Sequence, residues 1–134
     1  MRIIKIVILI LISSCSKEKS TEFKIKNKFV RDWKVVRYPH SNATLTILDN
    51  NEFNYRETGH LSKLYSEGIW SKSNDTITLN SLRPNKCLYI YDFSLNTKLS
   101  FESMETTLSN CLPESSSIIF TEFSNSQFVI KKDS

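Results

Sequence analysis

Glycine, proline and alanine are scarce in this 134-residue sequence, which has two glycines, three prolines and a single alanine. The lack of glycine excludes collagen-like chains and a glycine-rich phosphate-binding loop. No run of about 20 apolar residues is present, so a membrane-spanning helix is not expected. The chain is nevertheless 40% hydrophobic, which excludes a wholly disordered protein, and its length allows one domain.

The N-terminus has the three parts of a secretory signal peptide. Two basic residues lie within the first five positions, an apolar run covers residues 6–12, and two serines precede Cys15. Residues 12–15 (ISSC) resemble a bacterial lipobox, which implies cleavage before Cys15, a diacylglyceryl thioether on its sulfur and an acyl group on its amine. We therefore predict a signal peptide over residues 1–14 and a lipid anchor at Cys15. The alternative is an ordinary secreted protein with an incidental cysteine.

The positive charge of the chain is concentrated near the N-terminus. The net charge is +4, yet the residues beyond Lys28 comprise 11 basic and 12 acidic side chains, a net of −1. Nucleic-acid binding requires a clustered cationic face, so this balance excludes it. We assign residues 15–28 to the lipidated cysteine and a flexible polar tether, and residues 29–134 to a single folded domain.

Alternating apolar and polar residues predict an all-β domain. Leu45 and Ile47 alternate with threonines, and Phe53 and Tyr55 alternate with polar residues. Asparagine-rich turns at residues 49–51 and 73–75 separate these runs, because asparagine tolerates left-handed backbone. We expect a small antiparallel meander, closed as a barrel or folded as a sandwich. The predicted strands lie near residues 29–38, 43–48, 52–58, 63–72, 76–80, 86–93, 117–123 and 126–132, and residues 95–113 form an irregular loop or contain one helical turn.

The first half of this domain resembles small lipocalin-like lipoproteins of Bacteroidota. The similar segments are residues 32–36 (DWKVV), 44–47 (TLTI), 52–53 (EF), 65–70 (YSEGIW) and 75–81 (DTITLNS). The G-x-W pattern is present at Gly68 to Trp70, whereas Arg31 occupies the glycine position of the first motif. The resemblance implies a small antiparallel barrel or partial barrel, and most proteins of this kind have no assigned activity. With the lipobox, it implies a lipid-anchored cell-envelope protein, which we expect at the outer membrane, on its periplasmic or its surface face.

Two cysteines remain once Cys15 is lipidated. Cys87 and Cys111 form an even pair in an oxidising compartment, which predicts a disulfide; two free thiols are the alternative. The bridge would tie the uncertain segment over residues 95–113 to the strand near Cys87.

Catalytic and metal-binding patterns are weak in this sequence. His40 and His60 lie in predicted turns without the short ligand spacing of a metal site. No serine lies in a G-x-S-x-G or S-x-x-K motif. Glu102 and Glu105 occur in a polar stretch, without an apolar pocket that would raise a carboxyl pKa. We predict a protein that is not an enzyme and uses no metal or cofactor.

Aromatic residues provide the remaining indication of binding. Tyr89, Tyr91 and Phe93 share one side of a predicted strand that is apolar on both faces, so they either pack in the core or line a cavity. Trp33 and Trp70 are expected to fill the core or the barrel end. The predicted partners are the membrane, through the lipid on Cys15, and either a small apolar ligand inside the sheet or an envelope protein. In the second case the domain would be an inhibitor, immunity, adhesion or stress factor. The ligand-binding residues stay unassigned.

Overall fold

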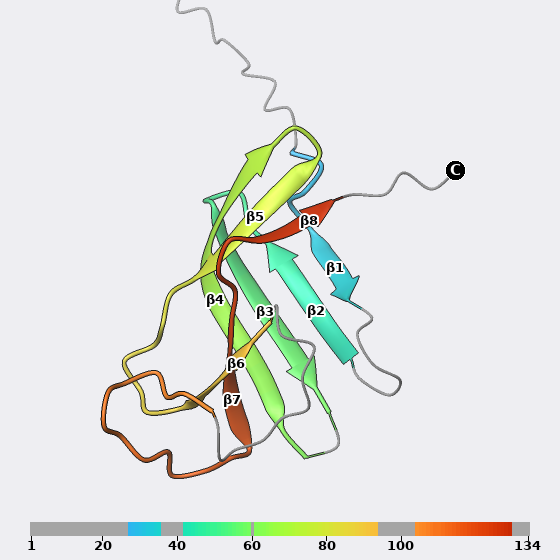
Figure 1. The fold of residues 1–134 in the computed structure, drawn as a ribbon. Helices are drawn as coiled ribbons and strands as arrows, with labels where there is room; N and C mark the ends of the chain where they lie inside the picture. Colours follow the sequence, from blue (N-terminus) through green and yellow to red (C-terminus); the bar gives the residue numbers. More distant parts are fainter. Residues whose placement is uncertain (1–26, 36–41, 60, 94–103, 130–134) are drawn as a thin grey trace, which may run out of the picture.

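The computed structural model describes residues 27–35, 42–59, 61–93 and 104–129, which form strands and loops (Figure 1). These residues contain no helix, so the predicted all-β class is confirmed. The strands are β1 (Asp32–Val35), β2 (Asn42–Ile47), β3 (Glu52–Thr58), β4 (Lys63–Ser73), β5 (Thr76–Ser81), β6 (Tyr89–Asp92), β7 (Ile118–Glu122) and β8 (Ser126–Val129).

The first five strands form an antiparallel meander in which each strand pairs with the next along the chain. Asparagine provides the left-handed residue in two of the turns, with φ of 65° at Asn51 between β2 and β3 and 55° at Asn74 between β4 and β5. A non-glycine residue adopts this conformation at the lowest cost when it is asparagine or aspartate. The asparagine-centred turns predicted from the sequence are therefore confirmed.

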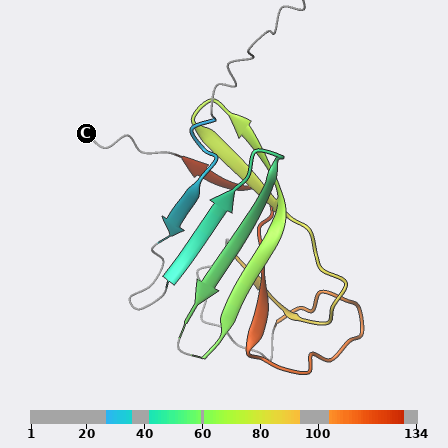
Figure 2. The same ribbon diagram turned by 180° about the vertical axis from the view of Figure 1, so that it is seen from behind.

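Strand β4 divides one of its edges between two partners. Its first residues, from Lys63 to Tyr65, pair in parallel with β7, and its later residues, from Gly68 to Ser73, pair antiparallel with β5. β4 and β5 approach so closely at Gly68 that an added Cβ would lie 2.1 Å from the carbonyl oxygen of Asn80. Glycine in a strand commonly marks such a close backbone approach. The sheet curls around this divided strand into a half-barrel (Figures 1 and 2).

The second half of the domain contains two parallel pairs that the sequence did not predict. β7 lies between β4 and β6 and is parallel to both, after which β8 returns antiparallel to β5. The strand predicted over residues 86–93 begins only at Tyr89, because Lys86 and Leu88 are hydrogen-bonded to the side chain of Thr107. Residues 104–113 form a loop without a helix, joined to β6 by a bridge between Thr106 and Tyr89. Residues 94–103 lie outside the described residues.

The segment before β1 closes one end of the half-barrel. β1 starts three residues later than the predicted strand, because residues 28 and 29 form a turn that places Phe29 fully inside the core. Lys28, which the sequence assigns to the tether, forms an ion pair with Asp75 in the turn between β4 and β5. The guanidinium of Arg31, at the position where glycine was expected, lies 3.8 Å from the ring centre of Trp33.

The inward-facing side chains form two apolar clusters. The larger lies on the concave face of β2 to β5, where alternate residues point inward. Trp70 is buried there, and its indole nitrogen donates to the carbonyl oxygen of Leu48 at 2.8 Å, while Trp33 is partly buried at the edge. The smaller cluster joins Leu64, Tyr91 and Ile119 from β4, β6 and β7. The buried members of the larger cluster are Phe29, Ala43, Leu45, Ile47, Phe53, Tyr55, Trp70, Ile77, Leu79 and Phe123.

Candidate functional site

Aromatic rings fill the described part of the half-barrel interior. Phe123 is at their centre, with ring-centroid distances of 5.5 Å to Phe53, 5.2 Å to Tyr55 and 4.5 Å to Phe93. Phe128 lies 6.2 Å away on the β8 side. These are the tilted and edge-to-face distances at which aromatic pairs stabilise a core. Phe93, one of the three aromatic residues considered for a ligand cavity, therefore packs against other rings.

A hollow lies on the opposite, outward face of β3 and β4. We call it the outer groove; its volume is about 510 Å³. Arg56 and Tyr65 are cross-strand partners on this face. The facing wall is the segment after β5 that contributes Pro84, Lys86 and Leu88. The groove is lined by Arg56, Glu57, Thr58, Lys63, Leu64, Tyr65, Glu67, Pro84, Lys86, Leu88 and Ile118.

Two smaller hollows extend the outer groove at its ends. One, of about 400 Å³, shares Thr58, Lys63 and Ile118 with the groove and includes Leu61, which is 93% exposed. The other, of about 270 Å³, shares Glu67 and includes Leu82, which is 58% exposed. The three hollows are therefore neighbours along β4, and each of the two smaller ones includes an exposed leucine.

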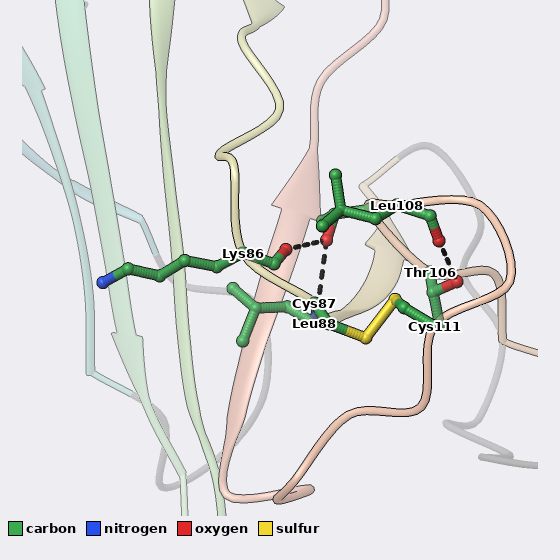
Figure 3. The surroundings of a disulfide bond; sticks show 7 residues. Lys86, Cys87, Leu88, Thr106, Leu108 and Cys111 are labelled. Carbon is green, nitrogen blue, oxygen red and sulfur yellow. Dashed lines mark hydrogen bonds between the residues drawn. A yellow bond between two sulfur atoms is a disulfide. The ribbon is translucent and has the colours of Figure 1, made fainter.

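The wall of the outer groove is fastened by Thr107 and by a disulfide, whose surroundings Figure 3 shows. The Thr107 hydroxyl accepts a hydrogen bond from the Leu88 amide at 3.0 Å and donates one to the Lys86 carbonyl. Between these two residues, Cys87 is joined to Cys111 with a Cα–Cα distance of 5.9 Å. Figure 3 shows the side chains of Lys86 and Leu88 pointing away from the disulfide. The wall residues are therefore held from behind while their side chains face the groove.

Positive charge predominates in the outer groove. Arg56, Lys63 and Lys86 line it, and none of them forms an ion pair with any residue that the structure describes. Glu67 is the acidic side chain of the groove on the same outward face, and Glu52 lies further along this face in the extension near Leu82. Glu57 belongs to the opposite face, where it is buried and accepts a hydrogen bond from the Tyr55 hydroxyl at 2.6 Å.

Tyr65 forms part of the groove floor. Its ring contacts the buried Phe120 edge-to-face with a centroid distance of 5.7 Å. Burial raises the pKa of the Tyr65 phenol above its usual 10.0, and the nearby negative charge of Glu67 raises it further. The Tyr65 phenol, which lines the groove, is neutral at physiological pH.

A charged cluster lies beside the groove on β7 and the wall segment. Arg83 makes two hydrogen bonds to the carboxylate of Glu122, at 2.6 and 3.1 Å, and approaches Glu105 at 3.8 Å. The carboxylate of Glu122 raises the pKa of the Arg83 guanidinium. Arg83 is therefore already paired with Glu122. The cations that could pair with a ligand are those that line the groove.

The sequence-predicted site residues are only partly covered by the structure. Cys15, His40, His60 and Glu102 lie outside the described residues. Cys87 and Cys111 form the bridge described above, and Glu105 contributes to the charged cluster.

Sequence reasoning missed the outer groove itself. Strand alternation was sufficient to place Arg56 and Lys63 on one outward face, but no local pattern indicated that Lys86 would lie opposite them.

The described ranges contain no group of three histidine, cysteine or acidic side chains arranged to hold a metal ion. Across the same ranges, no helix has the length and apolar character needed to cross a bilayer.

The fold and groove define a class: a small all-β half-barrel whose outward groove is bounded by a disulfide-fastened segment. No family model, curated protein or solved structure matches the chain.

Proposed function

We propose that this protein is a non-catalytic cell-envelope lipoprotein, anchored through lipid on Cys15, whose domain binds a partner protein through the outer groove. The observation that supports this function is the contrast between the two faces of β3 and β4. Among the described residues, the inward face is packed with aromatic rings, whereas the outward face has a groove whose cations form no ion pair with a described side chain and whose neighbouring hollows include exposed leucines. An interaction surface of this kind needs no cavity inside the half-barrel.

A lipocalin-like binder of a small apolar molecule is the second candidate. The smaller apolar cluster favours it, because Tyr89 and Met104 are only partly buried against Leu64, Tyr91 and Ile119. An apolar ligand could complete the burial of these two side chains at the β6 end of the half-barrel. Native mass spectrometry of the periplasmically exported protein distinguishes the candidates, since a captured ligand adds a mass that disappears on denaturation.

The anchor is tested by cell fractionation. The Cys15→Ala protein should leave the membrane fraction, because two or more acyl chains are needed for stable anchoring and this variant has none. The matched control is Ser16→Ala, which should remain with the outer membrane. Retention of Cys15→Ala in the membrane would contradict the lipoprotein assignment.

The groove is tested by site-specific photo-crosslinking in intact cells. A photoreactive amino acid replaces Leu82 at the groove end or, as the control, Lys34 on β1, which is exposed and lies outside the groove. We expect a discrete protein adduct from position 82 and none from position 34. Equal adducts from both positions, or a mass adduct in native spectra with no crosslink, would reject the groove as the functional surface.

A further inference from the structure

The outer groove and its two extensions have the dimensions of an extended chain segment. They follow β4 from Lys63 to Gly68, which is about 17 Å at roughly 3.3 Å per residue. The apolar contacts of the central groove come from Tyr65, Leu88 and Ile118. A partner strand lying along this floor would place alternate side chains against these contacts and the others toward the rim.

The charged side chains that line the groove favour a partner segment of negative charge. Three cations, Arg56, Lys63 and Lys86, line the central groove, where Glu67 is the outward acidic side chain. Glu52 adds a second carboxylate only in the extension near Leu82. A carboxylate binding there meets cations that have no ion-pair partner among the described residues. The chain's own N-terminal stretch is an unsuitable occupant, because residues 16–28 contain five lysines and two glutamates.

The groove is also organised before any partner binds. Lys86 and Leu88 belong to a short segment that Thr107 holds on both sides of Cys87, and the disulfide fixes the same segment to Cys111. A wall held in this way loses little conformational entropy on binding, which increases the affinity available from a small contact area.

We propose that the outer groove binds an extended acidic segment of a partner protein, in which carboxylates alternate with apolar side chains. The apolar side chains lie against Tyr65, Leu88 and Ile118, and the carboxylates pair with Arg56, Lys63 and Lys86. This inference rests on the proposed function of the groove as a protein-binding surface. It specifies the chemistry of the partner.

The test uses the mature lipoprotein in detergent and a fluorescent peptide of alternating glutamate and leucine, with anisotropy as the readout. Control peptides replace glutamate with lysine or leucine with serine. We expect only the glutamate–leucine peptide to bind. Its affinity should fall about tenfold in the Lys63→Gln/Lys86→Gln variant and should weaken as salt shortens the Debye length. The matched variant Lys34→Gln/Lys72→Gln removes two exposed cations outside the groove and should bind like the unmodified protein.

Three binding results would overturn the inference. The first is equal binding of the lysine–leucine peptide, and the second is equal loss in both double variants. The third is tighter binding of dihexanoyl phosphatidylglycerol than of the peptide, lost in Lys63→Gln/Lys86→Gln, which would assign the cations to a lipid headgroup. A crosslink from position 82 without binding of the acidic peptide would overturn this inference alone. Absence of the crosslink would overturn the proposed function beneath it.

Discussion

The two halves of the domain are assembled by different kinds of contact. In residues 27–81, every strand pairs with its neighbour in the chain, as in the turn where Ser73 faces Thr76. In residues 82–129, β7 pairs with β4 and β6, so that Ile118 lies beside Lys63. The first half is therefore built from successive local hairpins, whereas the second half is joined to the first through the pairs β4–β7 and β5–β8. Non-local contacts of this kind carry a larger loop-closure cost.

The largest loss of stability is expected at Gly68, where the pairing of β4 with β5 begins beside its pairing with β7. Gly68→Ala should destabilise the domain by at least about 4 kcal/mol, because its Cβ would collide with the backbone of Asn80 and Ser81. Urea unfolding followed by tryptophan fluorescence measures the effect. Gly59→Ala is the control, since its Cβ would lie at an ordinary 3.9 Å from the Ser62 oxygen. Equal stability of the two variants would show that the close approach is not required.

Phe123 connects the halves through the ring cluster. Phe123→Ala should cost about 3–4 kcal/mol, because it removes a fully buried ring from contact with Phe53, Tyr55 and Phe93. Phe128→Ala should cost less, since Phe128 is only partly buried. Thermal unfolding of both variants checks this order. The reverse order would indicate that β8, rather than the end of β7, holds the second half in place.

The disulfide should matter to the second half more than to the first. In the chain-entropy model, closing the loop between Cys87 and Cys111 stabilises the fold by about 3.5 kcal/mol. We expect Cys87→Ser/Cys111→Ser to lose roughly that amount and to become insensitive to reductant. Hydrogen exchange should accelerate in residues 84–93 and 104–122 while β2 and β3 stay protected. Uniform acceleration would show that the halves unfold as one unit.

Thr107 provides a smaller and more local perturbation. Thr107→Val should cost about 2 kcal/mol, because it leaves the Leu88 amide and the Lys86 carbonyl without their partner in a part-buried position. Thr106→Val is the matched control, since it removes one hydrogen bond to the Leu108 carbonyl at an exposed position. Differential scanning calorimetry should detect a clear loss only for Thr107. Equal losses would contradict its role in holding the groove wall.

The smallest expected effect is spectroscopic and concerns the groove floor. Tyr65 should ionise above 10.0, and Tyr65→Phe identifies its contribution to the phenolate absorbance. Because the folded pKa is raised, its stabilising contribution is present below 10.0 and is lost as the pH rises through the folded value. Glu67→Gln should lower the pKa only in part, since burial is the larger cause. Complete return to 10.0 in that variant would show that charge, and not burial, dominates.

The sequence was informative where structure depends on neighbouring residues. Alternation at Leu45, Ile47, Phe53 and Tyr55 predicts the inward face of β2 and β3, and Asn51 and Asn74 occupy the predicted turns. The same local reasoning failed over residues 86–88, where hydrogen bonds from a residue about 20 positions away replace strand pairing.

By itself, the sequence determined the all-β class, the hairpin order from β1 to β5 and the candidate pairing of Cys87 with Cys111, because each depends on side-chain periodicity, turn chemistry or residue counting. Only the tertiary structure decided that β7 enters in parallel beside β4, and that Lys86 lies across a groove from Arg56 and Lys63. The physical reason is that strand partners distant in the chain are selected by the summed burial and hydrogen bonding of the assembled domain, which no local segment contains.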